Sequence, residues 1–536
     1  MKSSSQHSFA QIPKADIPRS VFNRSHGYKT TFNAGNLIPI FVDEVLPGDT
    51  MNLRLTTFAR LATQIVPIMD NLTLDLFFFF VPNRLLWDNW QRFCGEQPKP
   101  GDSTDILAPV TYSPSGAGWA TESMADYFGL PVNMPDIAAS ALPFRAYNLI
   151  WDQWFRDENL QDPIAELHGD GPDAWSYFNI KKRGKRHDYF TSCLPWPQKG
   201  PGVELPLGTT APIKALAGDY PSFKPAGQGT DQTLYSLGTQ ADAPTHQNVV
   251  LNAGANPLGA GDLSWGAHIG LYADLSTASA ATINSLRVAF QTQKMLERDA
   301  RGGTRYTEIL RAHFGVVSPD ARLQRAEYLG GGTIPVIVNP VSQTSATPLA
   351  AGTVKDTPQA NLAAYAVAGG GAGFSKSFVE HGIILGLLCV RSDLSYQQGL
   401  PKMWSRRTRV DYYWPALAHL GEQAVLMKEI WCEGLPSDEE VFGYQERWAE
   451  YRYFPSQITG KFRTQTVGGG LDYWHLAEYF SAKPQLSGAF IEQPTSVVDR
   501  AIAVPSEPQF IFDSHFDIKH VRAMPTYSVP GLVDHF

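Results

Sequence analysis

The stretch Leu72-Thr-Leu-Asp-Leu-Phe-Phe-Phe-Phe-Val-Pro82 restricts the folds open to this chain more than any other feature. Side chains alternate between faces along a β-strand, so every second residue from Leu72 to Phe80 shares one face, which is apolar throughout. The opposite face begins with Thr73 and Asp75 and becomes apolar only at Phe77. The pattern predicts a sandwich strand that is buried on both faces at its aromatic end and half solvated at its start.

The composition indicates a large protein with many turns. The chain has 536 residues, 43% of them apolar, with 46 glycines and 39 prolines, which favours many short strands over long helices. A net charge of −8 argues against a protein that coats nucleic acid with its whole surface, because neutralising phosphates requires a basic excess. Local basic patches remain compatible with this charge.

The four cysteines, Cys94, Cys193, Cys389 and Cys432, lie far apart in the chain. This spacing indicates neither a zinc site nor a disulfide framework, and it fits assembly in a reducing cytoplasm. The first residues lack the apolar segment of a signal peptide, and no apolar run reaches the ~18 residues of a membrane span. We therefore expect neither secretion through a signal peptide nor insertion into a membrane.

Further strands are expected on both sides of a helical, loop-rich middle. Their ranges are 37–45, 51–55, 383–391, 424–431 and 509–522. Helices are expected over 86–94, 143–154, 282–301 and 305–314. The aromatic stripe of the second helix should pack in the core, and His313 should be a satisfied, partly buried side chain rather than a ligand. Triple glycines at 330–332, 369–371 and 468–470 are interpreted as turns, because no phosphate-loop context surrounds them.

We expect a single domain over residues 32–536, preceded by an arm and interrupted by two insertions. These three segments differ in composition from the rest of the chain. Residues 1–31 carry five basic side chains and one acid and are interpreted as an extended basic arm, either solvated or in contact with nucleic acid. Residues 200–281 are rich in Gly, Ala, Thr and Pro, have few charges, and predict a surface insertion. A second loop-rich insertion is expected over 340–373.

Two stretches mix cations with aromatic rings, as single-stranded nucleic acid requires when rings stack on bases and cations follow phosphates. The first contains Lys181, Lys182, Arg183, Lys185 and Arg186, flanked by Tyr177, Phe178, Tyr189 and Phe190. The second contains Arg406, Arg407 and Arg409, followed by Tyr412, Tyr413 and Trp414. For the first stretch the default interpretation is a solvated face, as for most charge runs, and the flanking rings add the nucleic-acid contact as a hypothesis. Packing against the core is the alternative for the second, and it is favoured for Trp414, which precedes a proline.

No pattern in the sequence demands an enzyme. Asp513, His515 and Asp517 share one strand face, but residues four apart on a strand are separated by roughly 13 Å, too far for both aspartates to bind one ion. No paired carboxylates stand out for acid and base catalysis. A β-sandwich enzyme or carbohydrate-binding protein nevertheless remains an alternative, since long aromatic loops would suit it. No metal or cofactor is expected.

Several long strings of residues carry a family resemblance. They are Pro67-Ile-Met-Asp-Asn-Leu-Thr-Leu-Asp-Leu-Phe-Phe-Phe-Phe-Val-Pro-Asn-Arg-Leu-Leu-Trp87, Leu296-Glu-Arg-Asp-Ala-Arg-Gly-Gly-Thr-Arg-Tyr306, Gly443-Tyr-Gln-Glu-Arg-Trp-Ala-Glu-Tyr-Arg-Tyr453, Val504-Pro-Ser-Glu-Pro-Gln-Phe-Ile-Phe-Asp513 and Val529-Pro-Gly-Leu-Val-Asp-His-Phe536. The chain closely resembles the major capsid protein of microviruses, most nearly the gokushovirus branch of small bacteriophages with circular single-stranded DNA. The resemblance covers nearly the whole chain apart from the two loop-rich segments.

The resemblance implies an eight-stranded antiparallel jelly roll with long helical and loop insertions, which assembles into a T=1 icosahedral shell around the DNA in the host bacterial cytoplasm. It implies that residues 200–281 form a protrusion at the threefold axes suited to attachment to a host receptor. It also implies three protein partners: a small basic DNA-packaging protein, an internal scaffolding protein and a DNA pilot protein. The acidic net charge makes a basic partner physically reasonable.

Overall fold

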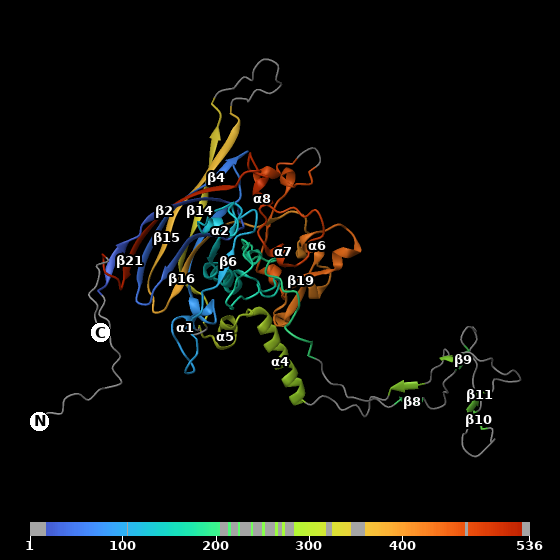
Figure 1. Cartoon of the computed structure of the whole chain (residues 1–536). Coiled ribbons are helices and arrows are strands. Elements are labelled where there is room, and N and C mark those ends of the chain that lie inside the picture. The colour runs from blue at the N-terminus through green and yellow to red at the C-terminus, as the bar shows by residue number, and fades with distance from the viewer. Residues whose placement is uncertain are drawn as a thin grey trace. The chain divides into compact units, whose positions relative to one another are not determined.

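The computed structural model describes residues 18–103, 105–203, 283–317, 324–344, 360–466 and 470–527, together with six short strands between Ile213 and Ala273 (Figure 1). The chain divides into two compact units. One comprises residues 1–199 and 298–536, and the other comprises residues 200–297.

Nine strands of the first unit form one continuous antiparallel sheet system. They are β1 (Ser20–Asn23), β2 (His26–Phe32), β3 (Ile38–Val45), β4 (Thr50–Gln64), β5 (Leu72–Pro82), β14 (Glu327–Ser342), β15 (Leu362–Ser377), β16 (Gly382–Ser392) and β21 (Phe510–Arg522). Strands β1 and β2 pair with different halves of β21 and therefore share one strand position. The spatial order is β1/β2, β21, β4, β15, β14, β5, β16, β3.

Strand β14 connects two four-stranded sheets. Its first part, Glu327–Val336, pairs with β5, and its last part, Ile337–Ser342, pairs with β15. With the strand positions numbered along the chain, the two sheets have the orders 1-8-3-6 and 5-4-7-2, in which each sheet mixes early and late strands. This is the arrangement of a jelly roll, and the predicted fold class is confirmed. Figure 1 shows β14 and β15 extending past the other strands as a two-stranded ribbon.

The main hydrophobic core lies between the two sheets. Leu72, Leu74, Leu76, Phe78 and Phe80 of β5 belong to one buried cluster with Phe512 and Phe516 of β21. Burial alternates along β21 as the sequence predicts, because successive side chains of a strand point to opposite faces. The facing rings pack in pairs, for example Phe78 with Phe374, whose centroids lie 5.4 Å apart.

Helical insertions cover the second face of β5. Helix α3 (Leu142–Ile150) begins with Pro143 in its first turn and continues as a π-helical turn, Trp151–Phe155. The ring of Phe77 contacts Phe155 at 5.3 Å between centroids, and that of Phe79 contacts Trp154 at 5.4 Å. The aromatic stripe of this helix is therefore core, as predicted, and it covers the aromatic face of β5.

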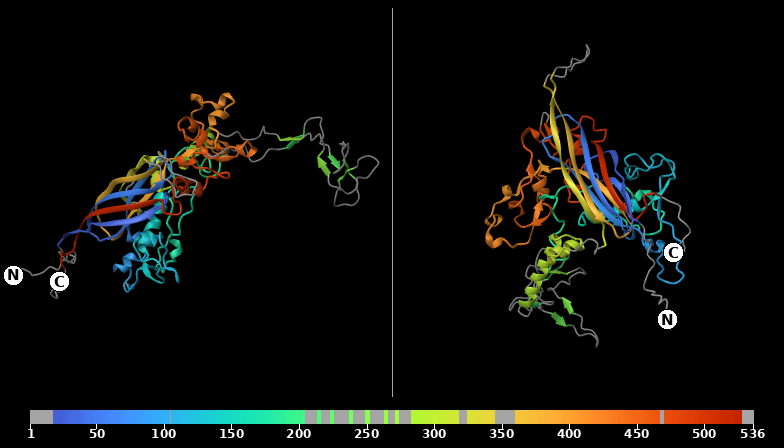
Figure 2. Two further views of the ribbon diagram at one scale, coloured as in Figure 1. Left: turned by 90° about the horizontal axis from the view of Figure 1, so that it is seen from above. Right: turned by 90° about the vertical axis from the view of Figure 1, so that its left-hand side faces the viewer.

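Short elements make up the rest of the first unit. The helices are α1 (Trp90–Phe93), α2 (Met124–Tyr127), α5 (Tyr306–Phe314), α6 (Met427–Ile430), α7 (Gly488–Ile491) and α8 (Ser496–Asp499). The strands pair as β6 (Val110–Tyr112) with β7 (Ala138–Ser140), β17 (Ser395–Tyr396) with β20 (Ser456–Gln457), and β18 (Glu422–Leu426) with β19 (Val441–Glu446). His313 on α5 lies 2.7 Å from the carboxylate of Asp299, which confirms that it is a satisfied, partly buried side chain. In Figure 2 the insertion that follows β5 (blue to green) and the one that follows β16 (orange) lie apart from each other beside the strands.

Several local predictions are wrong. The basic arm does not extend to residue 31, because Ser20–Phe32 pairs with β21. The predicted loop over 340–373 contains most of β15, and the glycines at 330–332 and 369–371 lie inside paired strands rather than in turns. The expected strand over 424–431 ends at Leu426 and continues as α6. The remaining glycines, 468 and 469, lie outside the described residues.

The second unit contains three nested antiparallel ladders. Strand β8 (Ile213–Ala215) pairs with β13 (Leu271–Ala273), β9 (Phe223–Pro225) with β12 (Leu263–Trp265), and β10 (Leu237–Thr239) with β11 (Val249–Leu251). In this nesting each pair lies, in sequence, between the two strands of the previous pair, so Ile213–Ala215 and Leu271–Ala273 lie side by side. Helix α4 (Ile283–Arg301) follows, as predicted, and its Phe290 side chain is exposed.

Candidate nucleic-acid contact residues

The first basic stretch is an extended segment held between two other parts of the chain. The amide of Leu37 donates to the carbonyl of Lys181 at 2.9 Å, and the amide of Arg183 donates to Gly35 at 2.9 Å. On the other side, the amide of Lys185 donates to Ile491 at 2.6 Å. Because the backbone is fixed on both sides, each basic side chain has a defined direction.

Arg183 points to the sheet and binds a buried carboxylate of β5. Asp75 is only 3% exposed and lies 2.5 Å from Arg183, 2.9 Å from Arg391 and 2.8 Å from the hydroxyl of Thr333. Burial by itself would raise the pKa of Asp75, but Arg183, Thr333 and Arg391 together hold it below its ordinary value. The expectation that this end of the second face is solvated is therefore wrong for Asp75.

Lys185 and Arg186 are also engaged with acidic residues. The ammonium of Lys185 lies 2.6 Å from Glu478 and donates to the carbonyl of Phe490 at 2.5 Å, with its side chain 3% exposed. Burial raises the pKa of Glu478, and Lys185 partly opposes that rise. Arg186 lies 3.2 Å from Asp393 in a half-exposed pair and donates to Thr73 at 2.6 Å.

Lys181 and Lys182 form no ion pair with a carboxylate in the described part of the chain. The ammonium of Lys181 lies 5.8 Å from the centre of the Trp151 ring, and burial lowers its pKa although Glu492 opposes the shift. Both side chains are half-buried. Of the first stretch, these two lysines and Arg186 are the cations that a phosphate could approach without displacing a buried carboxylate.

The second stretch forms a surface segment. Arg406 lies 3.1 Å from Glu450 and 4.1 Å from the centre of the Tyr451 ring. Arg409 stacks on Trp414 at 4.7 Å, and Arg407 is exposed. The rings of Tyr412, Tyr413 and Trp414 are all exposed, so core packing, the reading favoured for Trp414, is wrong.

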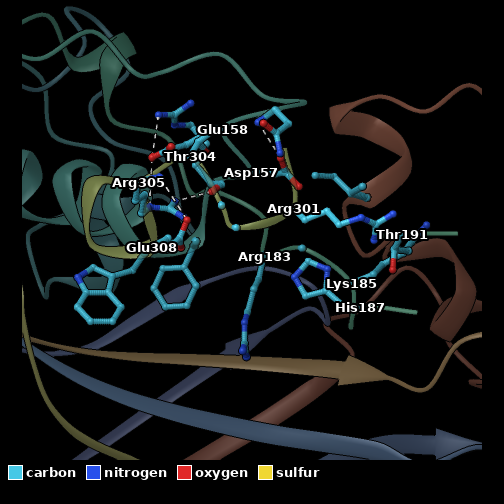
Figure 3. Close-up of a pocket in the computed structure, with 18 of the residues that line it drawn as sticks. Asp157, Glu158, Arg183, Lys185, His187, Thr191, Arg301, Thr304, Arg305 and Glu308 are labelled. Carbon is cyan, nitrogen blue, oxygen red and sulfur yellow. Dashed lines mark hydrogen bonds and ion pairs between the residues drawn. The ribbon is translucent and has the colours of Figure 1, made fainter. Parts of the chain in front are cut away.

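A large cleft of about 1030 Å³ opens beside Arg183 and Lys185 (Figure 3). Its aromatic wall includes Phe77 and Phe155. Its cations are mostly paired with acids: Arg305, for example, lies 3.2 Å from Glu158 and 3.4 Å from Glu308. In Figure 3 the side chain of Arg183 extends away from the other labelled residues, toward the strands below. Arg183 and the paired cations of this cleft therefore join the insertions to the sandwich.

Two glycines shape one edge of this cleft. They lie between Arg301 and Arg305, in one of the strings that carry the family resemblance. A Cβ on Gly302 would come within 2.5 Å of that of Ala312, and Gly303 has a φ of +94°, which favours glycine. The turn before α5 therefore requires glycine at both positions.

Sequence reasoning missed the acidic partners. Asp75, Glu478 and Glu450 come from segments remote from the basic stretches, and nothing local in the sequence pairs them.

Within the described residues, no group of three His, Cys, Asp or Glu side chains is placed to hold a metal ion. None of the described helices is long and apolar enough to cross a membrane.

The fold and the comparisons together define a viral structural protein. The family model described as "Capsid protein (F protein)" matches residues 10–532, so the chain belongs to this family of capsid proteins. It is 51% identical to capsid protein VP1 of Bdellovibrio phage phiMH2K, over 99% of this chain and 98% of that protein. Identity is 43% with capsid protein VP1 of Chlamydia phage 1 and 36% with that of Spiroplasma virus 4, each over 98% of this chain and 97% of the relative.

These relatives confirm the resemblance to the gokushovirus branch of the microviruses. The protein is a structural component of a virion and not an enzyme. The alternative of a β-sandwich enzyme or carbohydrate-binding protein is therefore wrong.

Proposed function

We propose that this capsid protein assembles into a T=1 icosahedral shell that encloses a circular single-stranded DNA genome. The observation that carries the proposal is the jelly roll with eight strand positions. The chain has this fold and matches relatives named capsid protein over nearly their whole length. A closed shell needs only a modest interface between neighbours, because the contacts are repeated around every symmetry axis.

The partners proposed follow from charge and from the family. A chain with a net charge of −8 does not neutralise a genome by itself, so a small basic DNA-packaging protein is proposed to supply the missing cations. An internal scaffolding protein and a DNA pilot protein complete the proposed set. Assembly takes place in the host cytoplasm, which suits a chain whose four cysteines are free.

Direct contact with DNA is proposed for the cations that form no ion pair with a buried carboxylate. In the first stretch these are Lys181, Lys182 and Arg186. In the second, Arg407 and Arg409 are exposed, and their contact with DNA is the alternative to the subunit contact proposed below. Arg183, Lys185 and Arg406 are assigned a different role, because each holds a carboxylate with little solvent exposure. Removing them would cost stability before it affected DNA.

Residues 200–281 are proposed to form the threefold protrusion and to contact a host receptor. Support comes from their nested ladders, which return the chain close to where it left, so an insertion of this length is compatible with an intact sandwich. Few charges and many small residues suit an exposed tip whose sequence can change.

Sedimentation of the purified protein, followed by negative-stain imaging, tests assembly directly. Closed particles of uniform diameter with icosahedral averages at T=1 are expected. A small soluble species under all conditions that permit scaffolding and packaging partners to bind would contradict the proposal.

A further inference from the structure

An exposed cluster of aromatic rings lies on two segments, one after β17 and the other after β19. We call it the aromatic patch and define it by Trp404, Tyr412, Tyr413, Tyr451, Tyr453 and Phe454. Exposure ranges from 46% for Tyr413 to 79% for Phe454, which is high for large apolar side chains. Soluble proteins rarely leave such side chains together in water unless a partner covers them.

The patch is one continuous surface. Trp404, Tyr451, Tyr453 and Phe454 line the same cavity of about 580 Å³. The centroid of Tyr413 lies 6.3 Å from that of Tyr451, and the guanidinium of Arg406 lies within 5.8 Å of both Tyr412 and Tyr451. Projecting rings therefore stand beside a hollow that side chains of a partner could fill.

The surroundings hold the patch in place before any partner arrives. The indole of Trp414 donates to the carbonyl of Arg409 at 3.0 Å, and that of Trp448 donates to Leu417 at 2.9 Å. Asp411 accepts from the amides of Arg407 and Thr408 at 2.9 Å and 2.7 Å. A surface fixed in this way loses little conformational entropy on binding.

The charges around the patch favour a protein partner over single-stranded DNA. Arg406 is paired with Glu450, both side chains being 10% exposed, and Lys402 lies 3.5 Å from Glu429. Single-stranded DNA requires cations that follow its phosphates along the rings. Here several of the cations near the six rings are engaged within the chain: Arg452 lies 2.7 Å from Glu446, and Arg409 stacks on Trp414. Rings with interspersed arginine are instead typical of the centre of protein interfaces.

We propose that the aromatic patch is a contact between neighbouring subunits, occupied by a second copy of this chain. The proposal rests on the assembly proposed above, and it adds which surface provides the contact. A capsid protein meets identical copies at high local concentration, and each copy must bury apolar surface against its neighbours. A hollow beside projecting rings suits a head-to-tail contact, which closes into rings about a symmetry axis.

The test compares two double variants. The patch variant combines Trp404→Ala with Phe454→Ala, and the control combines Phe58→Ala with Ile511→Ala, at similarly exposed positions on β4 and β21. Both variants should give soluble subunits with the melting temperature of the wild type. The yield of closed particles should fall at least about tenfold for the patch variant, while the control assembles normally. Equal loss in both variants, or normal assembly of the patch variant, overturns the proposal. Normal particle numbers with less DNA overturn it too, in favour of a DNA-stacking surface.

Footprinting keeps the proposal testable if a variant fails to fold. In wild-type particles, hydroxyl-radical labelling of residues 404–414 and 451–454 should fall several-fold relative to free subunits. Equal labelling in particles and subunits overturns the proposal. If the wild type forms no particles at all, the proposed assembly fails, and this outcome is distinct from a patch that stays accessible inside an intact shell.

Discussion

Arg183 and Asp75 form an ion pair 2.5 Å long although 108 residues separate them in the chain. The guanidinium also lies 4.6 Å from the centre of the Phe77 ring, so the same side chain covers one aromatic residue of β5 and neutralises an acid of that strand. Arg391, on β16, shares the carboxylate. A residue that the sequence offers as a DNA contact thus joins an insertion to the sandwich.

Replacing Asp75 with Asn should destabilise the subunit. Two arginines would lose their common carboxylate in a largely buried site, which typically costs about 3–5 kcal/mol. Chemical unfolding measures the loss. The matched control is Asp513→Asn, since Asp513 is exposed and lies 3.4 Å from Lys29 in a solvated pair worth about 1 kcal/mol or less.

The pH dependence of this loss identifies its cause. The folded pKa of Asp75 lies below its ordinary value, so its contribution is fully present above the unfolded pKa of about 3.9 and is lost as the pH falls through the folded pKa. The difference in unfolding free energy between wild type and Asp75→Asn should be constant near neutral pH and shrink below about pH 4. A difference that stays constant to pH 2 would exclude the ion pair as its source.

Phe78 should be among the most sensitive core positions. It is fully buried between the sheets, so Phe78→Ala should lower the unfolding free energy by about 3–5 kcal/mol. Phe58→Ala, at a half-exposed position on β4, is the control and should cost far less. Phe78→Asp should give no soluble subunit. A Phe78→Asp subunit that folds but fails to assemble would instead place this strand at a subunit interface.

The glycines of β15 should differ in their tolerance of a methyl group. A Cβ on Gly373 would overlap the carbonyl oxygen of Leu53 on the neighbouring β4, whereas a Cβ on Gly369 would lie 4.0 Å from its nearest atom, the carbonyl oxygen of Thr57. We expect Gly373→Ala to lower the melting temperature by several degrees, a loss of about 1–3 kcal/mol, and Gly369→Ala to change it little. Equal melting temperatures for the two variants would show that β4 can move away.

Shortening the insertion should separate folding from infection. With residues 200–281 replaced by a short Gly/Ser linker, the jelly roll should still fold and particles should still form, because the buried residues described for the main core lie between Phe32 and Tyr127 and between Ile334 and Ile518. Adsorption to host cells should fall, as counted by particles bound per cell. Normal adsorption by the shortened particles would contradict the attachment role.

Neutralising the cations that hold no buried carboxylate should reduce packaged DNA. Lys181→Gln, Lys182→Gln and Arg186→Gln together should lower the DNA content per particle, measured by absorbance ratio and quantitative amplification, while the subunit keeps its melting temperature. Lys185→Met is the contrasting variant and should destabilise the subunit, because Glu478 loses its partner. Unchanged DNA content in the triple variant would favour a solvated face for this stretch.

The periodic spacing of apolar residues along single strands and helices predicted much of the fold. The alternation of side chains gave the buried faces of β5 and β21, and the aromatic stripe of α3 was correctly expected in the core. Strand β15 was missed although Ala364, Ala366 and Ala368 alternate with more exposed residues, since small side chains imitate the composition of a loop. Its glycines serve close approach between strands, a need that arises only when the neighbouring strands are in place.

The sequence by itself determined which residues of each regular strand face the core, because side-chain alternation is a property of the backbone and needs no partner. The tertiary structure decided the roles of the charges. Asp75 reads as a solvated strand end in the sequence, yet it is buried because Arg183 and Arg391 reach it from remote segments. A buried charge is tolerated only where opposite charges converge, and their convergence depends on how the whole chain packs.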